Sequence, residues 1–296
     1  MMPDKSFASI TGPCLNEAQS FNTRFAMPVI NLHNVNLYYE IHGDGEPLIL
    51  IPGLGTGAWL WFKQVPAFAR FFRTIIFDPH GVGRSDKTSE ALTTRTLAAT
   101  VAELLNALDI EQAHVLGASL GGFVAQEFAL GYPQKTIRLV LCCTSAGGAR
   151  HIPPPANVLE AYAANFHLNA EERIRQNLLL AFAPRYITEH AAEVERVIEM
   201  RLSGVVPDEV YMNQVRAGQA FDAEARVSQI KVPTLVISGD ADNIVLVENS
   251  DNLAAAIPGA KLVIVQGGGH MFFIEQAETF NAAVLEFINH VRLSQT

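Results

Sequence analysis

The apolar residues of the chain gather in short runs that alternate with longer amphipathic stretches. Runs rich in Val, Ile and Leu predict strands over residues 36–43, 47–53, 74–78, 114–119, 137–145, 234–240 and 261–268. Between several of these runs apolar residues recur at helical spacing, which predicts helices over residues 58–71, 96–108, 121–132, 247–257 and 271–291. Because strands and helices alternate, we expect an α/β fold, in which helices cover both faces of a mainly parallel sheet.

The first part of the chain shows neither the strand pattern nor the helical spacing of apolar residues. Residues 1–26 carry turn-forming residues, and we expect them to be a loose N-terminal extension. A strand pattern begins at Met27, and this additional strand brings the expected sheet to eight strands. The connection from His33 to Val35 is too short for a crossover, so the strands on either side of it should be antiparallel.

The periodicity changes again over residues 148–222, which predict several helices in succession and no convincing strand. We interpret this segment as a helical cap, inserted after the sixth strand of a core formed by residues 27–147 and 223–296. Apolar cap residues such as Phe166, Leu179 and Ile198 could hold the cap on the core or contact a substrate. Packing is favoured, because apolar stripes on helices usually face a core.

Composition narrows the class of protein. Hydrophobic residues make up 49% of the chain and charged residues 17%, as in proteins with a large buried core. The net charge is -9 and no Lys/Arg cluster occurs, which argues against nucleic acid as a partner. The sequence has neither a membrane-spanning apolar run nor the pattern of a signal peptide. We therefore expect a cytoplasmic protein without a membrane partner; a homodimer is left open.

The cysteines do not suggest a disulfide framework. Cys142 and Cys143 are adjacent and badly placed to bridge to each other, and Cys14 is the only other cysteine. We expect the adjacent pair to be small core residues. No H-E-x-x-H or C-x-x-C motif occurs, so we expect neither a metal site nor another cofactor.

The sharpest chemical signal is G-x-S-x-G at Ser119, between a predicted strand and a predicted helix. A serine in such a strained turn needs small neighbours, and Gly117, Gly121 and Gly122 provide them. The alternative is a Gly-rich turn whose serine only caps the helix. The setting favours Ser119 as a nucleophile.

A serine nucleophile needs a base and an acid that orients the base. His270 follows three glycines directly after the last predicted strand, where an imidazole can reach the edge of the sheet. Asp240 and Asp242 both follow the preceding strand, and the residues alone leave both open as the acid. The chain therefore contains a candidate catalytic triad.

With these motifs the sequence resembles the α/β-hydrolase superfamily over roughly residues 27–292. The penultimate strand of that family typically ends G-x-x-D, and this resemblance selects Asp242 rather than Asp240. The order Ser119, Asp242, His270 along the chain also agrees with the family.

Acyl transfer also needs N–H donors for the developing oxyanion. One should be the N–H of Leu120, the residue after the nucleophile, and the resemblance to the family's H-G-x loop implies Leu54 as the other. Pro52 stands where the family more often has His, and His80 replaces Arg in the segment that resembles D-x-R-G-x-G-x-S. We assign no catalytic role to His80.

The core is similar to 3-oxoadipate enol-lactonases and related carboxylesterases. This resemblance implies that a small-molecule ester or lactone is cleaved through an acyl-enzyme, without a cofactor. Relatives with the same triad cleave carbon–carbon bonds or thioesters, or make peracids, and these activities remain alternatives. A different class is a small-ligand receptor that retains a vestigial triad.

Overall fold

The computed structural model describes residues 28–87, 91–204 and 206–289. The extension expected over residues 1–26 lies outside them. The strands are β1 (Val29–Leu32), β2 (Val35–His42), β3 (Glu46–Ile51), β4 (Phe72–Phe77), β5 (Ala113–Ala118), β6 (Thr136–Cys142), β7 (Thr234–Gly239) and β8 (Lys261–Val265). Core helices are α1 (Val65–Phe68), α2 (Thr94–Ala107), α3 (Leu120–Gly131), α9 (Val247–Ala256), α10 (Phe272–Glu275) and α11 (Ala277–Asn289).

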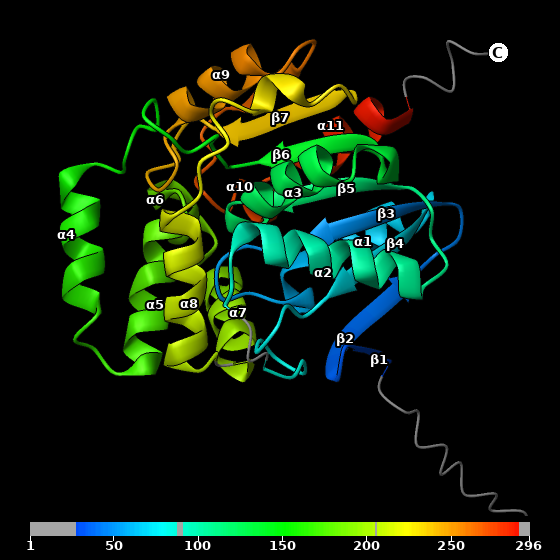
Figure 1. Cartoon of the computed structure of the whole chain (residues 1–296). Coiled ribbons are helices and arrows are strands. Elements are labelled where there is room, and N and C mark those ends of the chain that lie inside the picture. The colour runs from blue at the N-terminus through cyan, green and yellow to red at the C-terminus, as the bar shows by residue number, and fades with distance from the viewer. Residues whose placement is uncertain (1–27, 88–90, 205, 290–296) are drawn as a thin grey trace, which may run out of the picture.

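The eight strands form one sheet in the order β1-β2-β4-β3-β5-β6-β7-β8. β2 pairs antiparallel with both β1 and β4, and every other pair is parallel. His33 and Asn34 form the tight turn between β1 and β2, and both have positive φ. The expected mainly parallel eight-stranded α/β fold is therefore confirmed (Figure 1).

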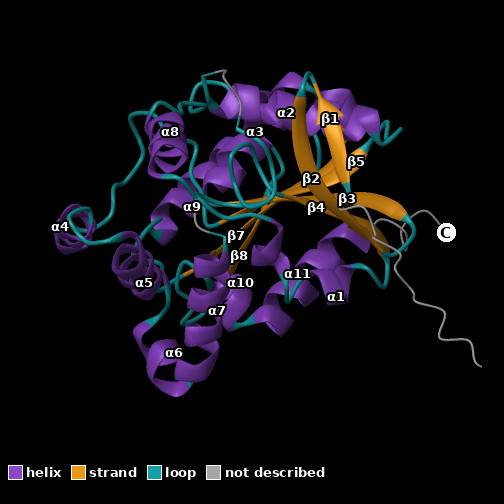
Figure 2. Ribbon diagram, turned by 90° about the horizontal axis from the view of Figure 1, so that it is seen from below, coloured by secondary structure: helices purple, strands orange, loops and turns teal. Residues whose placement is uncertain are grey.

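The sheet is covered on both faces, and alternate residues of a strand enter different cores. Leu48 and Leu50 of β3 pack in one cluster, whereas Ile49 and Ile51 pack in the other. Helices α2, α3 and α9 cover the face of Ile49, and α1 and α11 cover the opposite face (Figure 2). Because both faces are buried, the central strands are continuously apolar rather than alternating.

Two predicted helices are interrupted. The segment 58–71 forms a 3₁₀ turn at Ala58–Trp61 and the short helix α1, which has Pro66 in its first turn. Proline suits a helix start but cannot donate to the preceding turn, so one continuous helix is excluded. The segment 271–291 divides at Gln276, whose backbone leaves the helical region while its side chain donates to the Gln266 carbonyl.

The segment 148–222 contains helices and no strand among its described residues. They are α4 (Ala156–Asn165), α5 (Ala170–Ala181), α6 (Pro184–Glu189), α7 (Ala191–Ser203) and α8 (Asp208–Gln219). In Figure 1 these helices lie together beside the sheet. The two ends of the segment meet where Gly147 forms a β-bridge with Asp222 and the Ala223 N–H donates to the Ala146 carbonyl.

The apolar residues of these helices mostly hold them on the core, as expected. Phe182 and Ile198 are buried in the same cluster as Phe272 of α10, and Leu179 packs against that cluster. Phe166 differs, because its side chain is 55% exposed and lies beneath the guanidinium of Arg173. Phe166 therefore does not pack on the core.

The adjacent cysteines are buried and free, as expected for small core residues. Cys14 lies outside the described residues. None of the described helices is both long and apolar enough to cross a membrane. The described residues also hold no group of His, Cys, Asp or Glu side chains that could bind a metal ion.

Phe128 tests the packing of helix α3 on the sheet. The side chain is fully buried, so Phe128→Ala should lower the free energy of unfolding by about 3–5 kcal/mol through lost burial and a cavity. Phe71→Ala is the matched control, because Phe71 is 46% exposed and should cost less than about 1 kcal/mol. Urea denaturation measures both, and equal losses would contradict the described packing.

Candidate active site

The predicted site residues lie at one edge of the sheet. Ser119 directly follows β5, Asp242 follows β7, and His270 follows β8. β5, β6, β7 and β8 are neighbours and parallel, so their carboxyl ends point the same way. This is the edge at which open α/β sheets bind their ligands.

Ser119 occupies a strained turn, with φ 55° and ψ -119°. The turn is possible because its neighbours lack side chains: a Cβ on Gly117 would lie 2.1 Å from the Gly121 carbonyl oxygen. A Cβ on Gly121 would lie 2.2 Å from the Ile51 carbonyl oxygen. Ser119 stands at the N-cap of α3, but its side chain makes no cap hydrogen bond. The Ser119 side chain therefore does not cap the helix, which argues against a serine whose only role is capping.

The structure brings His270 and Asp242 together. His270 Nδ1 lies 2.8 Å from Asp242 Oδ2, and only 8% and 2% of the two residues is exposed. Asp242 Oδ1 accepts hydrogen bonds from the N–H groups of Ile244 at 2.8 Å and Val245 at 2.9 Å. These bonds fix the carboxylate, which in turn orients the imidazole.

Asp240, the other candidate acid, has a different role. It is exposed, and its Oδ1 accepts a hydrogen bond from the Gly267 N–H at 2.6 Å. The side chain thus ties the β7 loop to the β8 loop and is bonded to backbone rather than to the imidazole. Of the two carboxylates, Asp242 is the one in contact with His270.

The electrostatics of the pair favour a charged imidazole. Burial on its own lowers the pKa of His270 and is the largest single effect. The charge and hydrogen bond of Asp242, with smaller contributions from Cys143 and Glu275, together outweigh burial and raise that pKa to about 9. The Asp242 carboxylate stabilises the imidazolium that forms when His270 takes a proton from a nucleophile. The pair can therefore act as a general base and then as a general acid.

Sequence reasoning missed Glu275, which holds the His270 loop. One of its oxygens accepts the Gly269 N–H and the other accepts the Ala183 N–H, both at 2.9 Å. Burial raises the pKa of Glu275, although these two donors oppose the rise. The carboxylate thus links the histidine loop to the helical segment. The signal in the sequence was a lone glutamate shortly after the histidine.

The two predicted oxyanion donors lie on segments that approach Ser119. A Cβ on Gly53 would lie 3.4 Å from Ser119 Cβ, so the loop of Leu54 packs directly on the candidate nucleophile. The Gly53 carbonyl accepts from Thr56 N–H and from Thr56 Oγ1, which fixes the turn. Leu120 opens helix α3, where N–H groups lack an intrahelical acceptor.

The D-x-H-G-x-G-x-S segment supports the same loop. Asp78 is buried, and its carboxylate accepts from the N–H of Ala58 and from both the N–H and Nε of Arg84. His80 Nε2 lies 2.9 Å from Thr100 Oγ1 of α2. These contacts give Asp78 a structural role, and they agree with assigning no catalytic role to His80.

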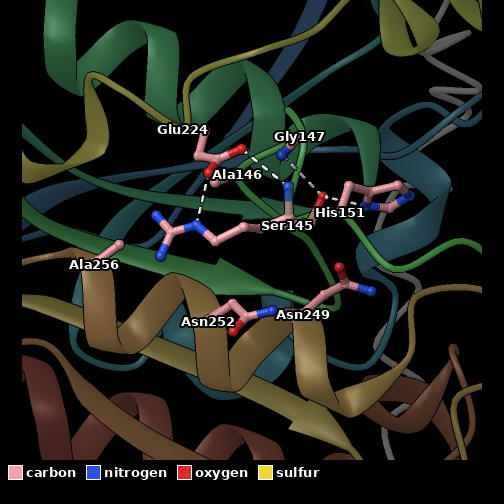
Figure 3. Close-up of a pocket in the computed structure, with 9 residues that line it drawn as sticks. Ser145, Ala146, Gly147, His151, Glu224, Asn249, Asn252 and Ala256 are labelled. Carbon is pink, nitrogen blue, oxygen red and sulfur yellow. Dashed lines mark hydrogen bonds and ion pairs between the residues drawn. The ribbon is translucent and has the colours of Figure 1, made fainter.

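A separate pocket lies at the neck of the helical segment, where its two ends meet the core, and no residue of the candidate triad lines it (Figure 3). Ser145, His151, Glu224 and Asn249 line it, and Arg150 forms an ion pair with Glu224. His151 Nδ1 lies 3.1 Å from Ser145 Oγ, and the Asn249 side chain bonds both the N–H and the carbonyl of Ile152. These contacts fasten the neck to helix α9.

Comparison with known proteins agrees with the described fold. A sequence profile of the α/β hydrolase fold matches residues 46–277. A relative named for carbamate hydrolysis, RutD of Azorhizobium caulinodans, is 30% identical over 266 residues, which cover 90% of this chain and 99% of the relative.

Two solved structures are similar over most of their length. The enol-lactonase of Burkholderia xenovorans LB400 has a TM-score of 0.79 at 26% identity, covering 88% of this chain and 99% of that one. A meta-cleavage product hydrolase, CumD of Pseudomonas fluorescens IP01, has a TM-score of 0.75 at 25% identity, covering 87% and 96%. The chain belongs to the α/β hydrolase fold family and is a hydrolytic enzyme of that family.

The choice between the two carboxylates can be tested directly. Asp242→Asn should lower kcat/KM for a 4-nitrophenyl ester by at least about a hundredfold, because the imidazole loses both its orientation and its counter-charge. Asp240→Asn is the matched control and should stay within about threefold, since its carboxylate bonds the Gly267 backbone. Equal losses, or a reversed order, would show that the wrong carboxylate is assigned.

The raised pKa of His270 predicts the pH dependence. The base must be neutral to accept a proton, so the acid side of the kcat/KM profile should have an apparent pKa above about 6.5. Asp242→Asn removes the charge that raises this pKa and should move the inflection to lower pH. Asp240→Asn should leave it in place. An inflection at or below about 6.5 in the unmodified enzyme would be inconsistent with a charge-stabilised imidazole.

Proposed function

We propose that the enzyme hydrolyses a carboxylic ester or lactone through an acyl-enzyme on Ser119. The observation that carries the proposal is the buried contact of 2.8 Å between His270 and Asp242, at the sheet edge where Ser119 occupies a strained turn. The same edge receives the loop of Leu54, whose N–H would stabilise an oxyanion. Nucleophile, base, orienting acid and N–H donors are the parts that acyl transfer requires.

In the proposed first step, His270 accepts the Ser119 hydroxyl proton as the serine oxygen attacks the carbonyl carbon. Nδ1–H donates to Asp242, which leaves Nε2 as the accepting nitrogen. Negative charge then develops on the carbonyl oxygen, where the N–H groups of Leu54 and Leu120 would stabilise it. The imidazolium returns its proton to the departing alkoxide, and the ester bond breaks.

In the second step water attacks the acyl-enzyme. The same imidazole takes a proton from water, the tetrahedral intermediate collapses, and Ser119 recovers its proton as the acid product leaves. For a lactone the alcohol and the acid remain one molecule, so a single hydroxy acid is released. No cofactor is needed for either step.

The names of relatives support related chemistries on this arrangement. The enol-lactonase supports lactone hydrolysis, whereas CumD is named a meta-cleavage product hydrolase and RutD a carbamate hydrolase. Each would use the same nucleophile and oxyanion donors. The cytoplasmic location and the lack of nucleic-acid or membrane partners stay predictions from the sequence, and a homodimer stays open.

Replacing the proposed nucleophile tests the proposal. Ser119→Ala should lower kcat on the best 4-nitrophenyl ester by at least about a thousandfold, because the covalent route is lost, while the circular dichroism spectrum is unchanged. Activity within tenfold of the unmodified enzyme would contradict the assignment.

A substrate panel separates ester and lactone hydrolysis from the alternatives. Esters, lactones, thioesters, carbamates and vinylogous diketones are compared by kcat/KM with the unmodified enzyme and with Ser119→Ala. Highest turnover on an ester or lactone supports the proposal, and highest turnover on another class replaces it. A burst of nitrophenolate without sustained turnover would instead indicate a ligand-binding protein with a vestigial triad.

A further inference from the structure

The loop that carries His270 is in direct contact with the helical segment. The Met271 N–H donates to the Ala181 carbonyl at 3.0 Å, which joins the residue after the base to the end of helix α5. On the other side of the base, a Cβ on Gly269 would lie only 2.4 Å from the Ala183 backbone nitrogen. Both neighbours of His270 therefore contact the short link between helices α5 and α6.

Glu275 completes this contact from the end of helix α10. Its two carboxylate oxygens accept the Gly269 and Ala183 N–H groups, so one side chain bridges the histidine loop and the α5–α6 link. A Cβ on Gly269 would also lie 2.7 Å from Glu275 Oε1, so a residue with a side chain there would push the carboxylate away. The bridge therefore depends on the carboxylate, the glycine and the two backbone donors together.

The charge of Glu275 also acts on the base. The titratable groups that face Glu275 are Asp242 after β7, His270 after β8 and Tyr186 of α6. Burial lowers the pKa of His270, whereas the charges of Asp242, of the Cys143 thiol after β6 and of Glu275 raise it. The Glu275 carboxylate therefore both bridges the boundary and stabilises the imidazolium.

A second link joins helix α10 to the helical segment at a different point. Lys63 donates to the Ile274 carbonyl at 3.1 Å and forms an ion pair with Glu193 of helix α7. The ion pairs among the described residues do not include Glu275, which keeps its negative charge between two neutral N–H donors. Burying part of an ionised carboxylate is costly, and attachment of α10 does not require it, because Lys63 already provides attachment. The charge of Glu275 thus calls for a role beyond attachment.

We propose that Glu275 is a positioning residue of the hydrolase: held by the backbone of both the histidine loop and the helical segment, its carboxylate places His270 and stabilises the imidazolium. The inference rests on the proposed ester or lactone hydrolysis, in which His270 must face the Ser119 hydroxyl and carry its proton between the two halves of each step. Glu275 acts through the Gly269 backbone and through its charge, and it exchanges no proton with the substrate.

Glu275→Gln tests this role, because the amide removes the charge and turns one of the two acceptors into a donor. On the best 4-nitrophenyl ester kcat should fall by at least about tenfold while KM stays within about twofold, as expected for a misplaced base. The inflection on the acid side of the kcat/KM profile should move to lower pH, because the imidazolium loses a stabilising charge. Glu275→Asp keeps the charge on a shorter side chain and should restore most of that shift. An unchanged inflection in Glu275→Gln, or a kcat within about threefold of the unmodified enzyme, would overturn the proposal.

Two further variants separate positioning from attachment. Glu278→Gln is the matched control for charge, because Glu278 is exposed at the start of α11, and both kcat and the inflection should equal those of the unmodified enzyme. Lys63→Gln breaks the other link to the helical segment, so it should lower the melting temperature but leave the inflection in place and kcat within about threefold. If Lys63→Gln moved the inflection and lowered kcat as much as Glu275→Gln, Glu275 would only attach the segment, and the proposal would be wrong.

A titration that needs no activity separates this inference from the proposed function. In a Ser119→Ala background the His270 imidazole is titrated by NMR, and the dispersion of the same spectra shows that each variant is folded. The pKa of His270 should be lower when Glu275→Gln is added and unchanged when Glu278→Gln is added. Equal pKa values in all three proteins would overturn the role of Glu275 even if ester hydrolysis by Ser119 were established. Conversely, undiminished ester hydrolysis by Ser119→Ala would overturn the proposed function while leaving the titration result in force.

Discussion

The parallel pairing of β5, β6, β7 and β8 is the constraint on which the rest of the site depends. Each strand of a parallel set ends at the same edge, so residues separated by more than a hundred positions in the chain meet there. The pairing of β7 with β8 is enough to bring His270 and Asp242 together, because each residue follows one of these two adjacent strands. Helices on both faces keep this part of the sheet dry and fixed.

Glycines near that edge replace side-chain volume with backbone contact. The turn at Ser119 is strained, and it persists because the surrounding backbone packs on it at positions where any Cβ would collide. The loop of Gly268 approaches its neighbours in the same way, because a Cβ there would lie 2.6 Å from Phe272 Cβ. A Cβ on Gly53 would lie 3.3 Å from the Ala118 carbonyl oxygen, which is a tight contact rather than a collision. Rigidity at the edge therefore comes from close backbone packing and from anchoring carboxylates such as Asp78 and Glu275.

Local patterns in the sequence predicted the strands, the serine turn and the histidine loop, because strand periodicity and turn chemistry are short-range properties. Ser119 and His270 were identified from glycine spacing, and a family resemblance was needed to prefer Asp242 over Asp240. The breaks in the helices over 58–71 and 271–291 were missed, although Pro66 was a visible signal for the first. The role of Glu275 could not be assigned from pattern, since it depends on contacts between distant segments.

The bridge between Gly147 and Asp222 gives the helical segment a narrow attachment. Both of its ends leave the core at nearly one point, so inserting the segment adds little loop-closure entropy to the folding of the sheet. An insert attached in this way can change in length and sequence while the strands below keep their register. The core can therefore keep the proposed catalytic residues unchanged while the helical segment varies. New ligand preferences can arise in that segment.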